Sequence, residues 1–190
     1  MIILASTSPY RRDLLQRLGL AFEVMAPAVD ETPIPGENAE RTALRLASAK
    51  ARAVHRAAPG DLVIGSDQVA EIDERQLGKP GDHESAVRQL RLVRGKRVIF
   101  HTALCLYRAG SDRLQLANVP TTVKFRELSD DEIERYLVRE TPYDCAGSAR
   151  VEGLGIALVE EIKSDDPTAL IGLPLMQLVT MLRNEGVKVL

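Results

Sequence analysis

The sequence predicts a single domain with a mixed α/β fold, in which a twisted sheet with flanking helices forms two lobes around a central cleft. Helical and extended patterns alternate along residues 1–190, without an internal repeat or a low-complexity segment. The two longest extended stretches, 97–107 and 114–126, meet across a turn at 109–112, which is typical of an antiparallel ribbon shared by two lobes. With 45% hydrophobic and 27% charged residues, the chain is long and apolar enough to bury a sizeable core.

An apolar strand over 2–5 runs directly into the first helix. Leucines recur at helical spacing over 14–18, and Gly19 closes the pattern. Ser8 is suited to capping this helix, because serine accepts a hydrogen bond from the first turn, and Pro9 suits the first helical position. The helix is therefore expected to begin directly after the turn 6–8.

This turn is a candidate anion site. The free N–H groups and the positive dipole end of the helix face the turn that carries Ser6 and Ser8. Arg11 could add a planar set of donors, whereas one of Arg11 and Arg12 is expected to be structural, since adjacent helical residues point about 100° apart. The same pattern also fits an ordinary strand-to-helix junction with solvated arginines.

The next elements are a short strand over 22–26, a proline-bounded loop over 27–35 with Asp30 and Glu31, and a helix over 39–57. Lys50 falls within the apolar stripe of this helix. A lysine at such a position either carries its ammonium group to the surface or has a functional role, and both alternatives stay open.

Asp67 is the strongest acidic candidate for catalysis. The pattern predicts a buried strand over 62–65 that ends at Ser66-Asp67-Gln68, followed by a hairpin of 69–72 with 75–79. In open α/β sheets the turns after the carboxyl ends of the strands form the ligand crevice. An aspartate after a strand is also a common turn former or helix cap, but no helical pattern follows here.

The remaining elements are helices over 82–93 and 131–139, the long ribbon between them, a strand that ends at 159 and a last helix from 174 to 182. Ser129 and Glu132 have the spacing of a capping box, which explains the acidic residues at 130–132 better than catalysis does. The glycines near Glu152 do not form a dinucleotide-binding motif, because a strand and not a helix is expected after Gly155.

Composition excludes several classes of function. The net charge is −2 and both signs are interspersed, so a polymeric nucleic acid is not an expected partner. No apolar run is long enough to span a bilayer, and no charged leader precedes the first strand, so a cytoplasmic protein is expected. Cys105 and Cys145 are isolated in stretches that resemble buried strands and are expected to be free thiols. The histidines at 55, 83 and 101 are too scattered for a zinc site.

Eight short motifs occur in order along nearly the whole chain: LASTSPYRR at 4–12, VDE at 29–31, AKA at 49–51, IGSDQ at 64–68, GKP at 78–80, CAGS at 145–148, EGLG at 152–155 and GLP at 172–174. Together they resemble the Maf (septum-formation) family of nucleoside triphosphate pyrophosphatases. The resemblance implies a fold related to that of the inosine triphosphate pyrophosphatases. It also implies hydrolysis of a nucleoside triphosphate to the monophosphate and pyrophosphate with a divalent metal, Mg²⁺ or Mn²⁺.

The family's functional positions map onto residues of this chain. The catalytic acid corresponds to Asp67, which would be a general base or a metal ligand, and Glu31 would supply a second oxygen to the metal. Lys50, Lys79 and Arg11 would neutralise the leaving pyrophosphate. Ser6 and Ser8 lie at the anion-binding turn.

Three positions resemble the subgroup that hydrolyses 7-methyl-GTP: Tyr10, Gln68 and Glu152 replace the arginine, threonine and glutamine of members that favour thymidine and uridine nucleotides. Methylation at N7 makes guanine cationic, so the face of Tyr10 could hold it by a cation–π contact of about 0.5 to 2 kcal/mol. Glu152 could accept hydrogen bonds from the guanine edge. Otherwise, Tyr10 only covers the helix start and Glu152 is a surface residue.

The sequence therefore predicts an enzyme that acts on a small nucleotide and limits the incorporation of modified nucleotides into nucleic acids. One alternative is a pyrophosphatase for dTTP, UTP or another modified nucleotide. Another is a non-catalytic nucleotide-binding regulator of cell division. A homodimer is left open, and a membrane partner is not expected.

Overall fold

The computed structural model describes residues 1–54, 56–111 and 113–190. Two residues used above, His55 among the scattered histidines and Asp112 in the predicted ribbon turn, lie outside the described residues. Among the described helices, none combines the length and the apolar composition that crossing a bilayer requires.

A mixed sheet runs through the molecule in the order β2-β1-β3-β5-β6-β7, with β4 paired to β3. β1 pairs in parallel with β2 and β3, and the other pairs are antiparallel. The strands are β1 (Ile2–Ala5), β2 (Glu23–Met25), β3 (Leu62–Ile72), β4 (Arg75–Leu77), β5 (Arg97–Arg108), β6 (Leu114–Phe125) and β7 (Val159–Ser164). The predicted α/β class and the long antiparallel ribbon are confirmed.

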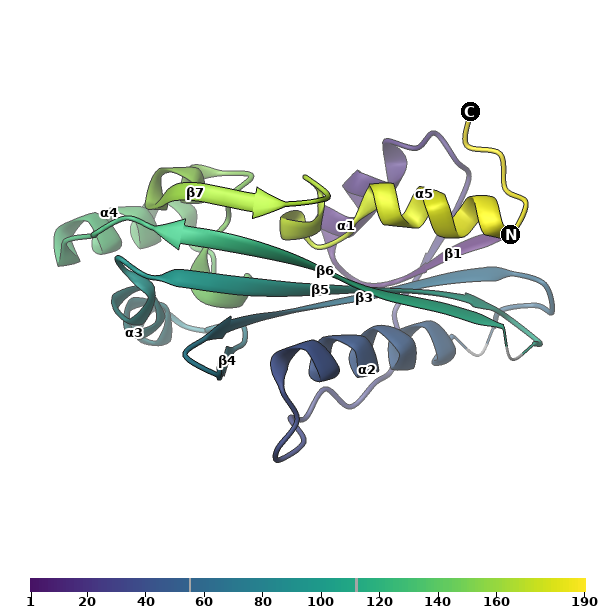
Figure 1. Cartoon of the computed structure of the whole chain (residues 1–190), viewed down its shortest axis with the longest axis horizontal. Coiled ribbons are helices and arrows are strands. Elements are labelled where there is room, and N and C mark those ends of the chain that lie inside the picture. Colours follow the sequence, from purple (N-terminus) through teal and green to yellow (C-terminus); the bar gives the residue numbers. More distant parts are fainter. Residues whose placement is uncertain (55, 112) are drawn as a thin grey trace.

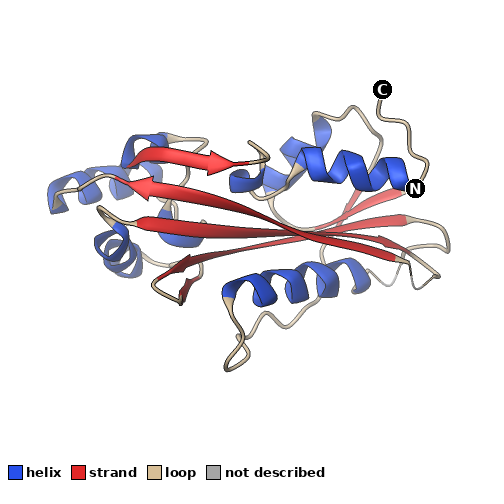
Figure 2. Cartoon of the chain, in the orientation of Figure 1, coloured by secondary structure: helices blue, strands red, loops and turns tan. Residues whose placement is uncertain are grey.

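Helices cover both faces of this twisted sheet (Figure 1, Figure 2). They are α1 (Pro9–Gln16), α2 (Ala39–Arg52), α3 (His83–Val93), α4 (Asp130–Glu140) and α5 (Leu175–Asn184), with short 3₁₀ turns η1 (Ala146–Ser148), η2 (Leu154–Leu158) and η3 (Ala169–Ile171). Figure 1 shows α1 and α5 on one face and α2 on the opposite face, whereas α3 and α4 lie at the far end of the long strands.

Three hydrophobic cores correspond to this arrangement. One lies under α1 and α5, with Leu14 and Leu178, and a second lies under α2, with Ala43 and Ala47. The third joins α3 and α4 to the distal halves of the long strands, with Leu137 at its centre. Because β3 and β5 contribute to all three cores, the two lobes share one sheet.

The predicted break in β3 at residues 66–68 is wrong. Ser66, Asp67 and Gln68 pair with residues 104, 103 and 102 of β5, so the antiparallel ladder continues without interruption from Leu62 to Glu71. The parallel pairing with β1, in contrast, ends at Gly65. Asp67 therefore lies in the middle of a strand, two residues beyond the point where its parallel neighbour ends.

Two other boundaries differ from the expected ones. α2 ends at Arg52 and not at 57, because the chain turns after Ala53 and leads back into β3 through a left-handed Gly60. The segment after Gly155 forms η2 and not a strand, and β7 begins only at Val159. Gly155 lies against the backbone of Arg150, where an added Cβ would be 2.4 Å from the carbonyl oxygen, so the chain folds back on itself. The segment still opens no α-helix, as a dinucleotide-binding motif would require.

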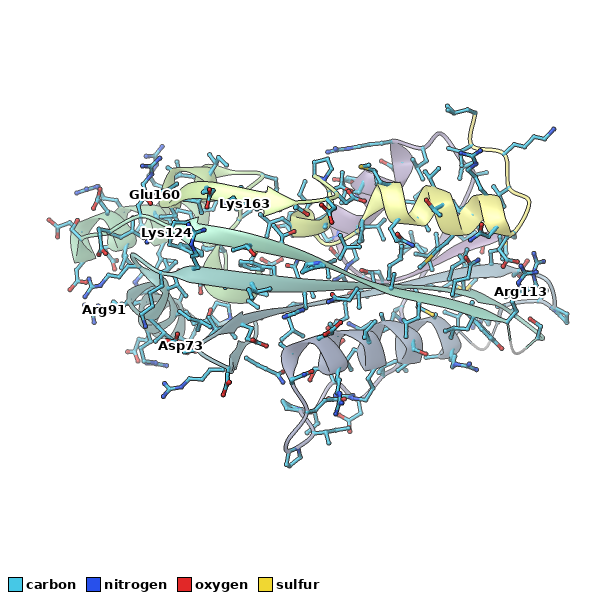
Figure 3. The ribbon with its side chains drawn as sticks, viewed as in Figure 1. Asp73, Arg91, Arg113, Lys124, Glu160 and Lys163 are labelled. Carbon is cyan, nitrogen blue, oxygen red and sulfur yellow. The ribbon has the colours of Figure 1, made fainter. Side chains whose placement is uncertain are left out.

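The two cysteines agree in part with the expectation from the sequence. Cys105 and Cys145 are free thiols, as predicted, but only Cys105 lies in a strand, and Cys145 lies in the turn before η1. Charged side chains of both signs occur together at the end of the molecule that carries β7, among them Asp73, Lys124 and Glu160 (Figure 3).

Candidate active site

A cavity of about 680 Å³ is lined by residues of both lobes. Its walls come from the turn between β1 and α1, from α2, from the middle of β3, from the loops after β4 and α4, and from η3. Every site residue that the sequence predicted lines this cavity: Ser6, Ser8, Tyr10, Arg11, Glu31, Lys50, Asp67, Gln68, Lys79 and Glu152. The structure thus brings together residues that are up to 146 positions apart in the chain, from Ser6 to Glu152.

The turn between β1 and α1 has the predicted geometry. Ser8 is the N-cap of α1, its hydroxyl accepts a hydrogen bond from the Arg11 N–H at 3.4 Å, and Pro9 is the first helical residue. The Ser8 N–H in turn donates to Ser6 Oγ at 3.1 Å. The start of α1 and both serine hydroxyls therefore lie at the cavity wall.

The two arginines of α1 differ as expected. Arg11 lines the cavity, and its Nε donates to the Gly172 carbonyl oxygen at 2.8 Å. Burial lowers the pKa of Arg11, and the nearby Asp67 and Glu31 oppose this effect. The side chain of Arg12 is half exposed and forms an ion pair with its neighbour Asp13, at 3.4 Å. Arg11 is thus the arginine of this helix that faces the cavity.

Lys50 lies between two carboxylates. Its Nζ is 2.6 Å from Asp67 Oδ1 and 2.7 Å from Glu31 Oε1. The side chains of Lys50 and Asp67 are only 9% and 10% exposed, so the lysine does not carry its ammonium group to the surface. Burial alone would raise the pKa of Glu31, but the hydrogen bond and charge of Lys50, with Lys79 and Arg11, hold this pKa below its usual value.

Gly65 permits this contact and was missed at the sequence level. A Cβ on Gly65 would lie 2.2 Å from the Ala47 carbonyl oxygen and 2.7 Å from the Ala51 nitrogen. α2 can therefore approach β3 closely, and this approach carries Lys50 to Asp67. A glycine inside an apolar strand is the signal for such a close backbone approach.

Lys79 reaches the cavity from the opposite lobe. It lies in the exposed loop between β4 and α3, beside Gly78. The carbonyl oxygen of Gly78 accepts hydrogen bonds from Gln89 Nε2 at 3.1 Å and from the Gly147 N–H at 3.4 Å. The loop with Lys79 is thereby tied to α3 and to η1.

Gln68 holds a wall of the cavity. Its amide nitrogen donates to Thr102 Oγ1 at 2.9 Å and to the carbonyl oxygens of Ala169 and Leu170 at 3.1 and 3.0 Å. Thr102, which is fully buried, also donates to the Ala169 carbonyl at 3.0 Å. The N–H groups of Gln68 are therefore engaged with η3, and its carbonyl oxygen is the atom that remains for a ligand. Thr102 was not identified from the sequence.

Asp166 fixes the base of the same wall. Its carboxylate accepts hydrogen bonds from the N–H of Thr168 at 3.0 Å and of Met176 at 2.7 Å, and it is 2% exposed as a residue. The second bond caps α5, whose N-cap residue Pro174 makes no side-chain cap. The segment from Asp166 to Met176 is thus closed into a loop that leads into α5.

Tyr10 and Glu152 line the cavity, and Arg150 contacts both of them. The Arg150 guanidinium lies over the Tyr10 ring, 5.1 Å from its centroid, and Arg150 Nε is 3.8 Å from Glu152 Oε1. Burial raises the pKa of Glu152, Glu140 and Asp144 raise it further, and Arg150 lowers it. Nothing in the sequence spacing had singled out Arg150.

Comparison with known proteins assigns this chain to a family. A family model described as Maf-like protein matches residues 1–185. The chain belongs to the Maf-like protein family. A relative from Methylobacillus flagellatus, 58% identical over 100% of this chain and 98% of its own, is named 7-methyl-GTP pyrophosphatase. One from Ralstonia nicotianae, 60% identical over 96% of this chain and 94% of its own, has the same name.

Solved structures include a distant likeness. The Ham1 protein of Staphylococcus aureus aligns with 66% of this chain and 72% of its own, at 14% identity and a TM-score of 0.45. This likeness is too distant to support an inference about the site of the Maf-like protein.

The cavity of this Maf-like protein combines three chemical features. The start of α1, with Arg11 and Lys79 nearby, offers hydrogen-bond donors and positive charge to an anion. Glu31 and Asp67, the two carboxylates paired with Lys50, point at one position. Tyr10 and Glu152 present an aromatic face and an anion, which suit a flat cationic ring.

Proposed function

We propose that this protein is a nucleoside triphosphate pyrophosphatase that hydrolyses 7-methyl-GTP to 7-methyl-GMP and pyrophosphate. The observation that carries the proposal is that one cavity contains both the Lys50–Asp67 pair and the pair of Tyr10 and Glu152. The names of the relatives from Methylobacillus flagellatus and Ralstonia nicotianae support the same activity.

The cationic groups stabilise the leaving pyrophosphate in this proposal. Hydrolysis between the α and β phosphates places new negative charge on the β phosphate, and fixed cations close to it lower the barrier. Arg11, Lys50 and Lys79 approach the cavity from three different elements, so they can surround a triphosphate chain. The serine hydroxyls and the N–H groups at the start of α1 complete the phosphate site.

Glu31 and Asp67 fit a hard divalent cation such as Mg²⁺ or Mn²⁺. Both carboxylates lie within 2.7 Å of one point, which the Lys50 ammonium holds. No group of three or more acidic, histidine or cysteine ligands occurs within 1–54, 56–111 and 113–190. Two carboxylates suffice for Mg²⁺, which completes its shell with substrate phosphates and water. When bound, such an ion would neutralise phosphate charge and lower the pKa of water.

Asp67 is the proposed base or water-orienting residue. It is buried and held by a hydrogen bond to Lys50, so its carboxylate has a fixed direction. A carboxylate in this place can accept the proton of a water molecule that attacks the α phosphorus. The other carboxylate of the cluster, Glu31, is 55% exposed and is better suited to exchange a lysine contact for a metal contact.

The methylated base is recognised by charge as well as shape. The cationic ring of 7-methylguanine would lie against Tyr10, with Glu152 accepting from its N1–H and amino edge. The side-chain nitrogen of Gln68 already donates its hydrogen bonds to Thr102 and η3. Among the described contacts, the side-chain carbonyl oxygen of Gln68 is therefore the atom left to accept a hydrogen bond from the base. Such an enzyme would act on free nucleotides in the cytoplasm and keep methylated guanine out of nucleic acids.

A substrate panel tests the proposal. Purified protein is incubated with Mg²⁺ or Mn²⁺ and with 7-methyl-GTP, GTP, dTTP or UTP, and pyrophosphate and orthophosphate are measured separately. We expect 7-methyl-GTP to be preferred over GTP by about 1 to 3 kcal/mol in kcat/KM, with pyrophosphate as the first product.

Three results would contradict the proposal. Preference for dTTP or UTP would assign another substrate. Orthophosphate as the first product would mean that a different bond breaks. Tight nucleotide binding without turnover under either metal would favour a non-catalytic regulator.

A further inference from the structure

We infer that Arg150 positions Tyr10 and Glu152 for the cationic base and so contributes to the choice of substrate. The inference rests on the proposed function and adds a residue to it. Arg150 belongs to the segment between η1 and η2, and its guanidinium contacts Tyr10 of α1 across the cavity wall.

Arg150 is itself held firmly. Its Nη1 is 3.0 Å from Glu140 Oε1 at the end of α4, and the other oxygen of Glu140 accepts the Leu154 N–H at 2.7 Å. The Arg150 N–H donates to the hydroxyl of Tyr136 at 3.0 Å, and Tyr136 is fully buried. Backbone and side chain of Arg150 are thus both anchored to α4.

This anchoring leaves the Glu152 carboxylate available. Glu140 takes the close ion pair with Arg150, at 3.0 Å, and the ion pair of Arg150 with Glu152 is long, with 3.8 Å between Nε and Oε1. The Arg150 Nε is buried and has no hydrogen-bond partner among the described residues. This unpartnered donor lies 3.8 Å from Glu152 Oε1, close enough to orient the carboxylate without a direct hydrogen bond.

Arg150 acts through its neighbours and not by contact with the ligand. Tyr10 and Glu152 line the cavity, whereas Arg150 is not among the described lining residues. The cation–π contact, with the guanidinium carbon 5.1 Å from the ring centroid, favours one placement of the Tyr10 ring, because a guanidinium prefers to lie over an aromatic face. A ring with one favoured placement presents a prepared surface to a flat base, which reduces the entropy lost on binding.

Charge adds to this positioning. The titratable groups around Glu152 include Arg150, Glu140, Asp144, Tyr10, Tyr136 and Cys145. The pKa of Glu152 is raised by burial and by the carboxylates of Glu140 and Asp144, and it is lowered by a backbone hydrogen bond and by Arg150. Tyr10 lies against the same arginine. Loss of Arg150 would therefore raise the pKa of Glu152 further.

The test compares Arg150→Gln and Arg150→Lys with the wild type. Arg97→Gln is the matched control, because Arg97 is an exposed arginine in an ion pair with Glu161 and lies outside the described cavity lining. For each protein, kcat and KM are measured with 7-methyl-GTP and GTP across pH, and binding of 7-methyl-GMP to metal-free protein is measured by calorimetry.

We expect Arg150→Gln to raise KM for 7-methyl-GTP and Kd for 7-methyl-GMP at least about tenfold, with GTP changed less than about threefold. The acid limb of the pH profile should move to higher pH. Arg150→Lys should restore the pH profile, because it keeps the charge, but only part of the affinity, because it lacks the planar stack. The control should match the wild type.

The role of Arg150 is overturned if Arg150→Gln keeps the wild-type selectivity, improves it, or lowers kcat equally for both substrates. If Arg150→Gln does not fold, Arg150→Lys decides, because it must still raise KM for the methylated substrate alone. A wild type that does not distinguish 7-methyl-GTP from GTP would overturn the proposed function itself, whereas a selective wild type with an equally selective variant would overturn only the inference.

Discussion

At the scale of single residues, the central feature is the buried lysine between two carboxylates. An isolated ammonium group is costly to bury, and removing one partner of a buried pair leaves a charge that nothing compensates. Lys50 has two partners, and the exposed Glu31 can leave without isolating it from Asp67. The cluster can therefore exchange one contact for a ligand while it remains neutralised.

Asp67→Asn should abolish turnover without unfolding the protein. The variant loses the carboxylate that would accept a proton, so kcat should fall at least about 100-fold. Lys50 keeps Glu31 as a partner, so we expect a loss of about 1 to 3 kcal/mol in the free energy of unfolding. Pyrophosphate release and urea unfolding measure the two effects. Asp13→Asn, at an exposed carboxylate, is the control, and a variant with near wild-type kcat would refute the role of Asp67.

Glu152→Gln should lower the selectivity for the methylated substrate and should keep or raise the stability of the protein. The folded protein raises the pKa of Glu152, chiefly by burial, so the folded state binds the proton more tightly than the unfolded state. Wild-type stability therefore falls as pH rises from the ordinary glutamate pKa of about 4.3 to the raised pKa. Glutamine does not ionise, so the variant should melt at an equal or higher temperature than the wild type at pH 7.

Below about pH 4 this difference should disappear, because Glu152 is then protonated in both states. The same variant should lose the preference for 7-methyl-GTP over GTP. Melting temperatures across pH and kcat/KM for both substrates measure these effects, with Glu160→Gln on the exposed face of β7 as the control. A variant that is less stable at pH 7 than at pH 4, relative to the wild type, would show that Glu152 is stabilised as an anion.

At the scale of elements, the contact of α2 with β3 decides whether the cluster forms. Helix and strand approach closely only because Gly65 has no side chain, and the same interface contains the alanines at 43, 47 and 51. Small residues on both surfaces bring the backbones together, so that the long side chain of Lys50 ends at Asp67. Packing and electrostatics are thus coupled through one interface.

Gly65→Ala should disrupt the packing of α2 on β3 and the Lys50–Asp67 contact at once. The added methyl group would lie within 3.0 Å of three atoms of α2, two of them backbone, so the helix must move. Overpacking of this kind costs about 1 to 3 kcal/mol. We expect lower stability in urea and a lower kcat, because Lys50 is displaced. Gly78→Ala, where an added Cβ meets open space, is the control for stability and should change it by under about 0.5 kcal/mol. Unchanged stability of Gly65→Ala would mean that the interface is looser than described.

At the scale of the whole molecule, the long strands make the lobes interdependent. β3, β5 and β6 cross the region of the cavity and carry core residues on both sides of it. Neither lobe can lose its core without breaking strands that the other lobe uses. This interdependence of the lobes gives a direct physical test of the prediction that residues 1–190 form a single domain.

Unfolding should occur in one transition. The chain has no tryptophan, so two variants can each place one reporter: Tyr107→Trp beside the core under α2, and Tyr143→Trp beside the core of α3 and α4. If the protein is one cooperative unit, both fluorescence changes and the loss of circular dichroism should share a urea midpoint within about 0.2 M. Separate midpoints would show that the lobes unfold as two domains.

The sequence predicted what depends on local pattern and on ordered motifs. The caps at Ser8 and Ser129 and the long ribbon are confirmed, and the predicted site residues all line one cavity. The course of β3 through Asp67 was missed, because polar residues in a strand are satisfied by a partner strand 37 positions away, which local pattern does not reveal. Arg150 was missed for the same reason, since its contacts with Tyr10 and Glu140 come from the fold.

The closed loop from Asp166 to Met176 has a consequence for motion. Asp166 holds both of its ends through the N–H groups of Thr168 and Met176, and Gln68 and Thr102 hold its middle. Amide protons that are hydrogen-bonded in this way exchange with deuterium only when the segment opens. The amides of Gly172 and of Met176, in the first turn of α5, should thus exchange as slowly as those of regular strands, although Gly172 lies outside the helices and strands. A nucleotide would then enter past the exposed segments that carry Glu31 and Lys79, where exchange should be fast.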